Sequence, residues 1–168
     1  MIHPETDWLA KWAHYTPSRL FLRDHATGDE WSYADAQGRA AGLAAWLQAE
    51  HGVARGDRVA VLARNSCEYV FLFLACVKLG AVLAPLNFRL TARELAVPLT
   101  DAAPVLVVRE PEYADRVDRN LRAADMAELA PVVRGEWPAD GFVPDREGEL
   151  DDLVMILYTS GTTGAPKG

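Results

Sequence analysis

The stretch Tyr158-Thr-Ser-Gly-Thr-Thr-Gly-Ala-Pro-Lys-Gly168 directly follows an apolar run, Leu153–Leu157, and carries most of the chemical information in this sequence. It contains three glycines, four serine or threonine side chains and one lysine. Glycines let backbone N–H groups come close to an anion. Hydroxyl groups donate further hydrogen bonds, and a lysine adds a mobile positive charge. The composition indicates a polyphosphate-binding loop placed directly after a strand.

Three alternatives were compared with this interpretation. The nucleotide-binding loop G-x-x-x-x-G-K-[ST] requires glycine at the sixth position from Gly161, where Pro166 stands, and a hydroxyl residue after Lys167, where Gly168 stands. The dinucleotide fingerprint G-x-G-x-x-G fails because Gly161 and Gly164 lack the first glycine. A glycine-rich surface turn with an exposed lysine stays open as the simpler explanation.

The complete string resembles the signature loop of the adenylate-forming superfamily, which comprises acyl-CoA synthetases, luciferases and the adenylation domains of peptide synthetases. A second segment, Val77–Asn87, is similar to a helix-to-strand junction of that superfamily that ends in Pro-Leu-Asn. The segment Phe88–Leu95 is similar to the one that follows in acyl-CoA ligases. Taken alone, the junction has a structural explanation, since Gly80 suits a turn and Pro85 a strand end. The resemblance extends over nearly the whole chain.

This resemblance implies an α/β fold in which residues 1–168 form the N-terminal portion of the large domain of an adenylate-forming enzyme. We expect a mostly parallel sheet with flanking helices, ending at the phosphate-binding loop. The parts of such an enzyme that bind adenine, ribose, magnesium and the acyl group lie downstream of that loop and are absent from this sequence. We therefore expect an incomplete fold, a fragment, and a chain that is inactive by itself.

The reaction implied by the resemblance has two steps. A carboxylate attacks the α-phosphate of ATP, with Mg²⁺, to give an acyl-adenylate and pyrophosphate; the thiol of coenzyme A then displaces AMP. Lys167 is the expected catalytic residue, since its charge would neutralise the leaving pyrophosphate. No metal ligand is assigned. The expected phosphate contacts are Thr159, Ser160, Gly161, Thr162, Thr163, Gly164 and Lys167.

Several functional alternatives remain at this point. Fatty, aryl and short-chain acids are all open as substrates, with Asn87–Leu95 favouring an acyl-CoA ligase over amino-acid adenylation. A non-enzymatic remnant that folds and binds a partner is the second class. The partners implied by the resemblance are a carboxylic acid, ATP and coenzyme A, and a homodimer is left open.

Composition and charge limit the partners and the cellular location that this chain can have. The chain has 168 residues, 50% of them hydrophobic, which is enough for one core. Its 17 basic and 24 acidic residues give a net charge of −7, which offers no electrostatic basis for binding nucleic acid or anionic membranes. The two cysteines, Cys67 and Cys76, are expected to be buried free thiols. Because Met1–Glu5 lacks a basic region and an apolar run, we expect no signal peptide and a cytoplasmic location.

Apolar strand-length runs alternate with helical patterns, which predicts βαβ units. We expect a hairpin from Phe21–Arg23 and Glu30–Ser32. Capping boxes at Ser32 and Thr91 predict two helix starts, and Gly52 and Gly80 predict two helix ends. Pro98 should kink or shorten the second capped helix. The remaining expected elements are helices at about Asp7–Tyr15, with Trp8, Leu9 and Trp12 on one side, Glu68–Leu79 and about Glu112–Leu129, and strands at Arg58–Leu62, Ala81–Ala84, Pro104–Val108, Pro131–Val133 and Leu153–Leu157.

Other segments have simpler interpretations. The apolar run Tyr69–Leu86 approaches the length of a spanning helix, but Lys78 at its middle favours a helix, a turn and a buried strand. The segment Arg64–Glu68 follows a core strand, where ligands often bind, yet helix capping explains it better. The run Asp115–Arg119 is expected to be a solvated helix face. Surface or capping roles are expected for His3, His14, His25 and His51, which lack metal-ligand spacing.

Overall fold

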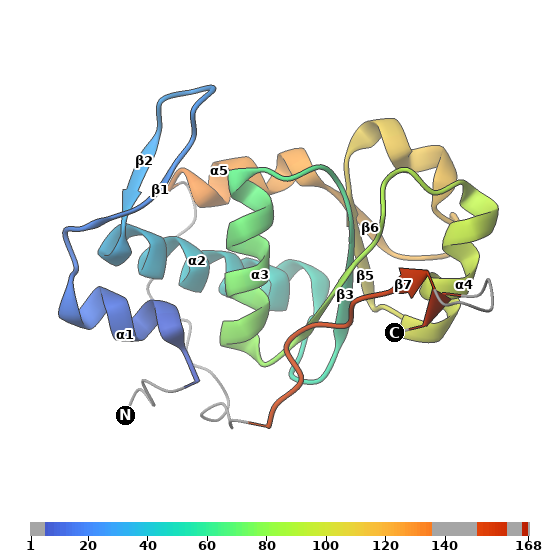
Figure 1. The fold of residues 1–168 in the computed structure, drawn as a ribbon, viewed down its shortest axis with the longest axis horizontal. Coiled ribbons are helices and arrows are strands. Elements are labelled where there is room, and N and C mark those ends of the chain that lie inside the picture. Colours follow the sequence, from blue (N-terminus) through green and yellow to red (C-terminus); the bar gives the residue numbers. More distant parts are fainter. Residues whose placement is uncertain (1–5, 136–150, 161–165, 168) are drawn as a thin grey trace.

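A four-stranded parallel sheet forms the centre of the computed structural model, which describes residues 6–135, 151–160 and 166–167 (Figure 1). The strands lie in the order β4-β3-β5-β6, so β3 has a parallel neighbour on each side. Their bounds are β3 Arg58–Leu62, β4 Val82–Pro85, β5 Leu106–Arg109 and β6 Ala123–Asp125.

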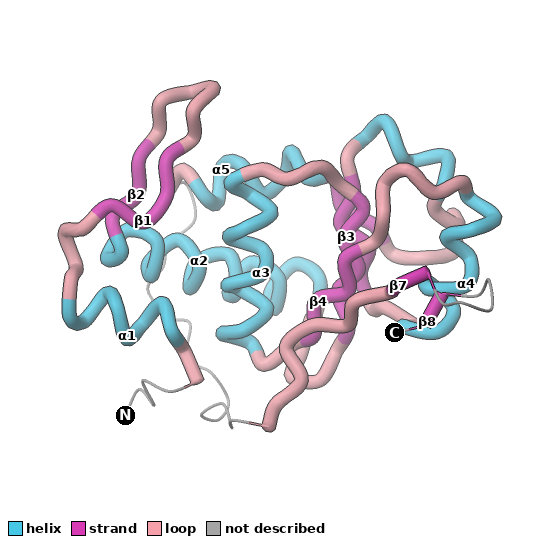
Figure 2. The backbone as a smooth tube through the Cα atoms, in the orientation of Figure 1, coloured by secondary structure: helices cyan, strands magenta, loops and turns pink. Residues whose placement is uncertain are grey.

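Helices cover both faces of this sheet (Figure 2). Along β3, Val59 and Val61 join the larger apolar cluster, whereas Ala60 and Leu62 join the smaller one on the opposite face. This alternation is the period-2 geometry of a strand, and coverage of both faces explains why residues 59–62 are all apolar and buried. The larger cluster includes α2 (Tyr33–His51), α3 (Cys67–Leu79) and α5 (Leu129–Val133), and the smaller includes α4 (Ala92–Ala102).

The predicted helix boundaries of α2, α3 and α4 are confirmed by their caps. Ser32 and Thr91 both form complete capping boxes, with Asp35 and Glu94 as the reciprocal partners. These hydrogen bonds lower the pKa of the Asp35 and Glu94 carboxyls. Gly52 and Gly80 end α2 and α3 with φ of 67° and 68°. Positive φ angles of this size suit glycine. They let the N–H groups of Gly52 and Gly80 donate to carbonyls in the last turn of each helix.

One face of α2 is fully buried and consists of Ala36, Ala40, Leu43, Ala44 and Leu47. Both cysteines lie buried as free thiols on α3, as expected. Burial raises the pKa of the Cys76 thiol to about 12.

The helix predicted at about Glu112–Leu129 is wrong. That region forms a short 3₁₀ turn, η1 (Pro111–Arg116), then β6, a second 3₁₀ turn, η2 (Met126–Glu128), and α5. Two of its basic side chains, Arg116 and Arg122, bond to backbone carbonyls elsewhere in the fold. Arg116 donates to the carbonyls of Phe88 (2.7 Å) and Leu90 (3.3 Å). The predicted strand Pro131–Val133 lies within α5. The run Asp115–Arg119 is not one helix face, because η1 ends at Arg116 and the chain is extended at the buried Val117.

Pro98 does not end α4, which continues to Ala102. The proline ring is buried together with Leu95, Leu99 and Ala102, on the helix face that packs against the sheet. Burial of the ring therefore offsets the loss of the backbone hydrogen bond that proline cannot make.

The run Leu153–Leu157 pairs with the sheet only at one point, so the predicted strand is reduced to a single bridge. Met155 lies parallel to Leu83 of β4, with Leu83 N donating to Val154 O (3.0 Å) and Ile156 N donating to Leu83 O (2.9 Å). Leu153 and Leu157 are 58% and 61% exposed. Among the described residues, β4 covers this run on one side only, which explains the weak pairing.

The N-terminal helix α1 (Trp8–Tyr15) packs on the helical layer through Leu9, which is 4% exposed. Of the three residues expected on one side of this helix, only Leu9 is buried, because Trp8 and Trp12 are 64% and 46% exposed. A buried ion pair joins α1 to α3: Lys78 Nζ, with its side chain 5% exposed, donates to Asp7 Oδ2 (2.7 Å) and to Gln37 Oε1 of α2 (2.7 Å). No helix in the described part of the chain combines the length and hydropathy needed to cross a bilayer.

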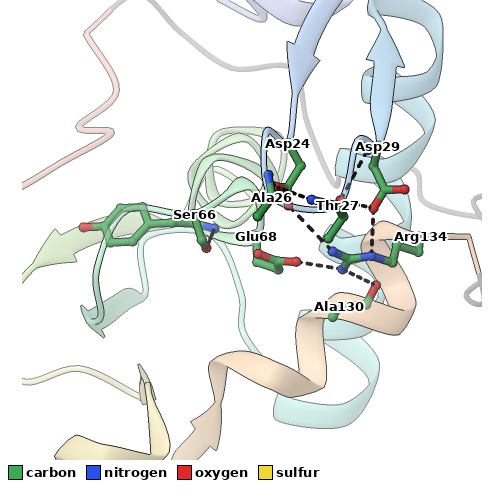
Figure 3. A network of polar contacts seen from close by, with 9 residues as sticks. Asp24, Ala26, Thr27, Asp29, Ser66, Glu68, Ala130 and Arg134 are labelled. Carbon is green, nitrogen blue, oxygen red and sulfur yellow. Dashed lines mark hydrogen bonds and ion pairs between the residues drawn. The ribbon is translucent and has the colours of Figure 1, made fainter.

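The hairpin of β1 (Leu20–Arg23) and β2 (Glu30–Ser32), predicted from the sequence, is joined to the helices by one arginine. Figure 3 shows Arg134, just after α5, with its guanidinium directed at three carboxylates. Its contacts are to Asp29 Oδ2 (3.2 Å), Glu68 Oε1 (2.7 Å) and Asp24 Oδ2 (3.9 Å). Arg134 thus connects the hairpin, α3 and α5.

Candidate active site

The two ends of the glycine-rich loop are paired as a short antiparallel hairpin. Strand β7 (Thr159–Ser160) lies opposite β8 (Pro166–Lys167), with Thr159 facing Lys167 and Ser160 facing Pro166 in the backbone register (Figure 2). Thr159 is exposed, so a ligand can reach its hydroxyl. The structure therefore brings the backbones of Thr159, Ser160 and Lys167 together. The predicted contacts Gly161, Thr162, Thr163 and Gly164 lie outside the described residues.

The hairpin lies beyond the carboxyl ends of the strands. Because the run through Met155 is parallel to β4, the chain leaves the sheet at the carboxyl edge just before Tyr158. Figure 1 shows β7 beside α4 at that edge, and β8 contacts α4. Open α/β sheets bind ligands outside the carboxyl ends of their strands. The position of the hairpin fits a phosphate-binding role.

Tyr158 attaches the start of the hairpin to α4. Its Oη donates to Asp101 Oδ2 (2.7 Å), and its ring packs against the apolar cluster between α4 and the sheet. Burial, together with the hydrogen bond to Asp101, raises the pKa of the Tyr158 phenol to about 12. Sequence patterns placed Tyr158 only directly after the apolar run Leu153–Leu157 and missed Asp101. The available signal was the acidic residue in the last turn of α4, where the helix dipole disfavours negative charge.

A hollow of about 430 Å³ borders this contact. It runs along one side of α4 and is lined by Ala96, Val97, Thr100 and Asp101. Val97 is 48% exposed there. The lining offers one carboxylate and one hydroxyl on an otherwise apolar surface.

The segment after β3 was the second sequence-based candidate, because ligands in this topology often bind where neighbouring connections cross opposite faces. Here α3 follows β3 on one face and α4 follows β4 on the other. The residues that follow β5 and β3 are joined there by hydrogen bonds, because the Glu110 carboxylate accepts from Arg64 N (2.9 Å) and Arg64 Nε (3.3 Å). Ser66 caps α3 by accepting from Tyr69 N (3.2 Å). The Ser66 hydrogen bond confirms the capping interpretation.

Histidines and acidic residues form no metal site in the parts of the chain that the structure describes, where no group of three or more potential ligands comes together. His51 has neither of the expected roles, surface or capping. Both of its ring nitrogens are buried without a hydrogen-bond partner, and its ring lies edge-on to Trp46 at 4.5 Å between centroids. Burial, and then the positive charge of Arg122, lower the pKa of the imidazole.

The sequence matches the AMP-binding enzyme family over residues 9–168, and the chain therefore belongs to that family. Its α/β fold is that of the N-terminal portion of an adenylate-forming enzyme, as the sequence predicted. It superimposes with a TM-score of 0.82 on the inhibitor-bound N-terminal domain of FACL13 from Mycobacterium tuberculosis, at 34% identity, covering 97% of this chain and 43% of that one.

Sequence comparison finds relatives that are named as CoA synthases or CoA ligases. The chain is 39% identical to a feruloyl-CoA synthase of Amycolatopsis sp. over 162 residues, which cover 96% of this chain and 32% of that protein. It is 34% identical to a 2-succinylbenzoate–CoA ligase of Geobacillus sp., covering 96% of this chain and 31% of that protein. The chain thus spans about a third of the length of the curated relatives it matches.

Proposed function

We propose that residues 1–168 provide the phosphate-binding portion of an AMP-forming acyl-CoA ligase. In this reaction a carboxylate attacks the α-phosphate of ATP, an acyl-adenylate forms and pyrophosphate leaves; coenzyme A then takes the acyl group and AMP leaves. The observation that carries the proposal is the paired hairpin at the carboxyl edge of the sheet, formed by the family's signature string. Because the chain spans about a third of its relatives' length, turnover is proposed for the longer polypeptide.

The residues proposed to bind phosphate are those of the hairpin and its loop. Lys167 would neutralise charge on the departing pyrophosphate, and the glycines would let backbone N–H groups approach it. Thr159 is exposed, and its hydroxyl would donate a hydrogen bond to a phosphate oxygen. Mg²⁺ would enter with ATP and offset phosphate charge, and none of the proposed phosphate-binding residues is proposed as a metal ligand.

The proposed acyl substrate is a fatty or aryl acid. Support comes from the relatives, which are named for feruloyl-CoA, 2-succinylbenzoate and, in Mycobacterium tuberculosis, long-chain fatty acids. Amino-acid adenylation is the second candidate. It is favoured by the likeness to VinN solved with 3-methylaspartate, at 30% identity and a TM-score of 0.79. A cytoplasmic location is proposed because ATP and coenzyme A are the proposed co-substrates and both cysteines are free thiols.

ATP–pyrophosphate exchange tests the proposal. The longest polypeptide that carries this sequence is incubated with ATP, labelled pyrophosphate and one acid at a time from ferulate, palmitate, 2-succinylbenzoate, acetate and aspartate. Exchange that depends on an acyl acid supports the ligase, and exchange with aspartate alone supports amino-acid adenylation. Absence of exchange with every acid would favour the non-enzymatic remnant. Size-exclusion chromatography of the same sample tests for a homodimer.

A further inference from the structure

We propose that Asp101 of α4 is a positioning residue for the phosphate loop. It acts through Tyr158 and fixes the point at which the chain leaves the sheet to enter the hairpin. This inference rests on the proposed function, because it assigns the loop a phosphate to bind.

The geometry behind the proposal is a single contact at the base of the hairpin. Tyr158 immediately precedes β7, and its Oη donates to Asp101 Oδ2 at 2.7 Å, between residues 57 positions apart in the sequence. A hydrogen bond to a carboxylate is shorter and stronger than one between neutral groups. The ring below it packs on the cluster that contains Leu95 and Leu99. Tyr158 is therefore held at both its ring and its hydroxyl.

The helix that carries Asp101 is itself fixed at both ends. Its first turn is closed by the Thr91–Glu94 capping box. Its last carbonyls are taken by Arg58 of β3, whose Nε donates to Ala102 O (2.8 Å) and whose second terminal nitrogen donates to Ala103 O (3.1 Å). Because α4 is held to the sheet in this way, the Asp101 carboxylate keeps Tyr158, and with it the start of the loop, in a fixed place relative to the sheet.

The location of Asp101 argues against a role in helix stability. It stands in the last turn of α4, where the partial negative charge of the helix end repels a carboxylate. The last turn of this helix contains no basic residue to compensate. The favourable partner in the described structure is Tyr158, so the acid at this position is explained by the contact with the hairpin.

Loss of this contact should change how the loop holds ATP. A displacement of about 1 Å in a positioned group costs on the order of 10²-fold in rate. Tyr158 keeps its packed ring in Tyr158→Phe, so we expect a smaller effect. The expected result is a KM for ATP raised about 3- to 10-fold in Tyr158→Phe and in Asp101→Ala, with the double variant no worse than either single one.

The experiment is ATP–pyrophosphate exchange in the longest polypeptide that carries this sequence, with kcat and KM for ATP measured separately. Tyr69→Phe, on α3, is the matched control for loss of a phenol hydroxyl, and Asp118→Asn is the control for loss of a surface carboxylate. A rise in KM in the paired variants alone supports the inference. Wild-type constants in Tyr158→Phe, or an equal change in Tyr69→Phe, would overturn it.

A spectroscopic titration keeps the inference separate from the proposed function. Burial, and then the hydrogen bond to Asp101 and its charge, raise the pKa of the Tyr158 phenol to about 12, and only the contribution of Asp101 is lost when that residue is replaced by alanine. In Asp101→Ala its ultraviolet titration should move toward the ordinary value of 10. An unchanged titration overturns the contact even in a protein that shows no exchange. Conversely, exchange lost in Lys167→Ala and unaffected in Asp101→Ala leaves the ligase standing and removes the positioning role.

Discussion

Replacing Asp7 by asparagine separates two roles of one carboxylate at the start of α1. Asp7 Oδ1 accepts from Ala10 N (2.9 Å) and caps the helix, while Oδ2 accepts from Lys78 Nζ (2.7 Å). Asparagine keeps the cap and removes the charge. Lys78, 5% exposed, then has only Gln37 as its partner among these groups. We expect the fold to keep α1 but to hold it less tightly.

The magnitude follows from the burial of the two partners. Removing one partner of a fully buried ion pair costs about 3–5 kcal/mol. Asp7 is 25% exposed and Gln37 remains, so we expect about 1–3 kcal/mol for Asp7→Asn. Lys78→Met removes the buried charge instead and leaves a carboxylate that water can reach. We expect less than about 1 kcal/mol there, with the double variant resembling Lys78→Met.

Hydrogen exchange of the amides of Trp8–Tyr15 measures this difference directly. At about 1.4 kcal/mol for each tenfold change, Asp7→Asn should speed their exchange by roughly 5- to 150-fold. Burial lowers the pKa of Lys78, and Asp7 opposes that shift. Without Asp7 the folded state binds its proton still less well than the unfolded state. Stability is therefore regained as pH rises toward 10.5, the ordinary pKa of lysine, and the deficit of Asp7→Asn should shrink. A larger effect for Lys78→Met than for Asp7→Asn would refute the reasoning.

Three further outcomes are expected. Lys167→Ala in the active polypeptide should slow adenylation by on the order of 10²–10³-fold in pyrophosphate exchange, with Lys11→Ala unchanged as the control. Arg134→Gln leaves the three carboxylates of Figure 3 without their cation. This variant should lower the free energy of unfolding, measured in urea, by about 1–2 kcal/mol, and by less in high salt. In Arg23→Gln, whose ion pair is exposed, the free energy of unfolding should fall by less than about 1 kcal/mol. The lowered pKa of His51, which Glu50 and Glu128 oppose, means that below its ordinary value of 6.5 the unfolded state gains the proton first. Stability should fall as pH drops from 6.5, and His51→Phe should flatten that dependence; an unaltered pH profile in the variant would contradict it.

Local sequence signals were sufficient where the structure depends on local chemistry. Ser32 and Thr91 predicted two helix starts, and Gly52 and Gly80 predicted two helix ends, because caps and left-handed residues act within one turn. The parallel sheet followed from the alternation of strand-length apolar runs, such as the one within Arg58–Leu62, with helical patterns. The glycines and hydroxyls of Tyr158–Gly168 predicted a binding loop, which stays a prediction, and they gave no sign that the two ends of the loop pair as strands.

The errors arose where distant residues decide the local structure. Between Glu112 and Leu129 the charge pattern is helical, but Arg116 bonds to two carbonyls near Phe88, and Arg122 bonds to the end of α2 at His51 O (2.7 Å). These contacts are worth more than the intrinsic preference for helix. Asp101 was missed for the same reason, since its partner Tyr158 is remote in the sequence.

The order β4-β3-β5-β6 has a consequence for the nascent chain. Strand β3 emerges first and gains β4 after one crossover, yet its other edge stays open until Leu106–Arg109 has been synthesised. During that interval an almost entirely apolar strand presents unpaired backbone groups. Translation beyond Arg109 closes the edge, and a ribosome-associated chaperone would be of most use to this polypeptide between those two moments.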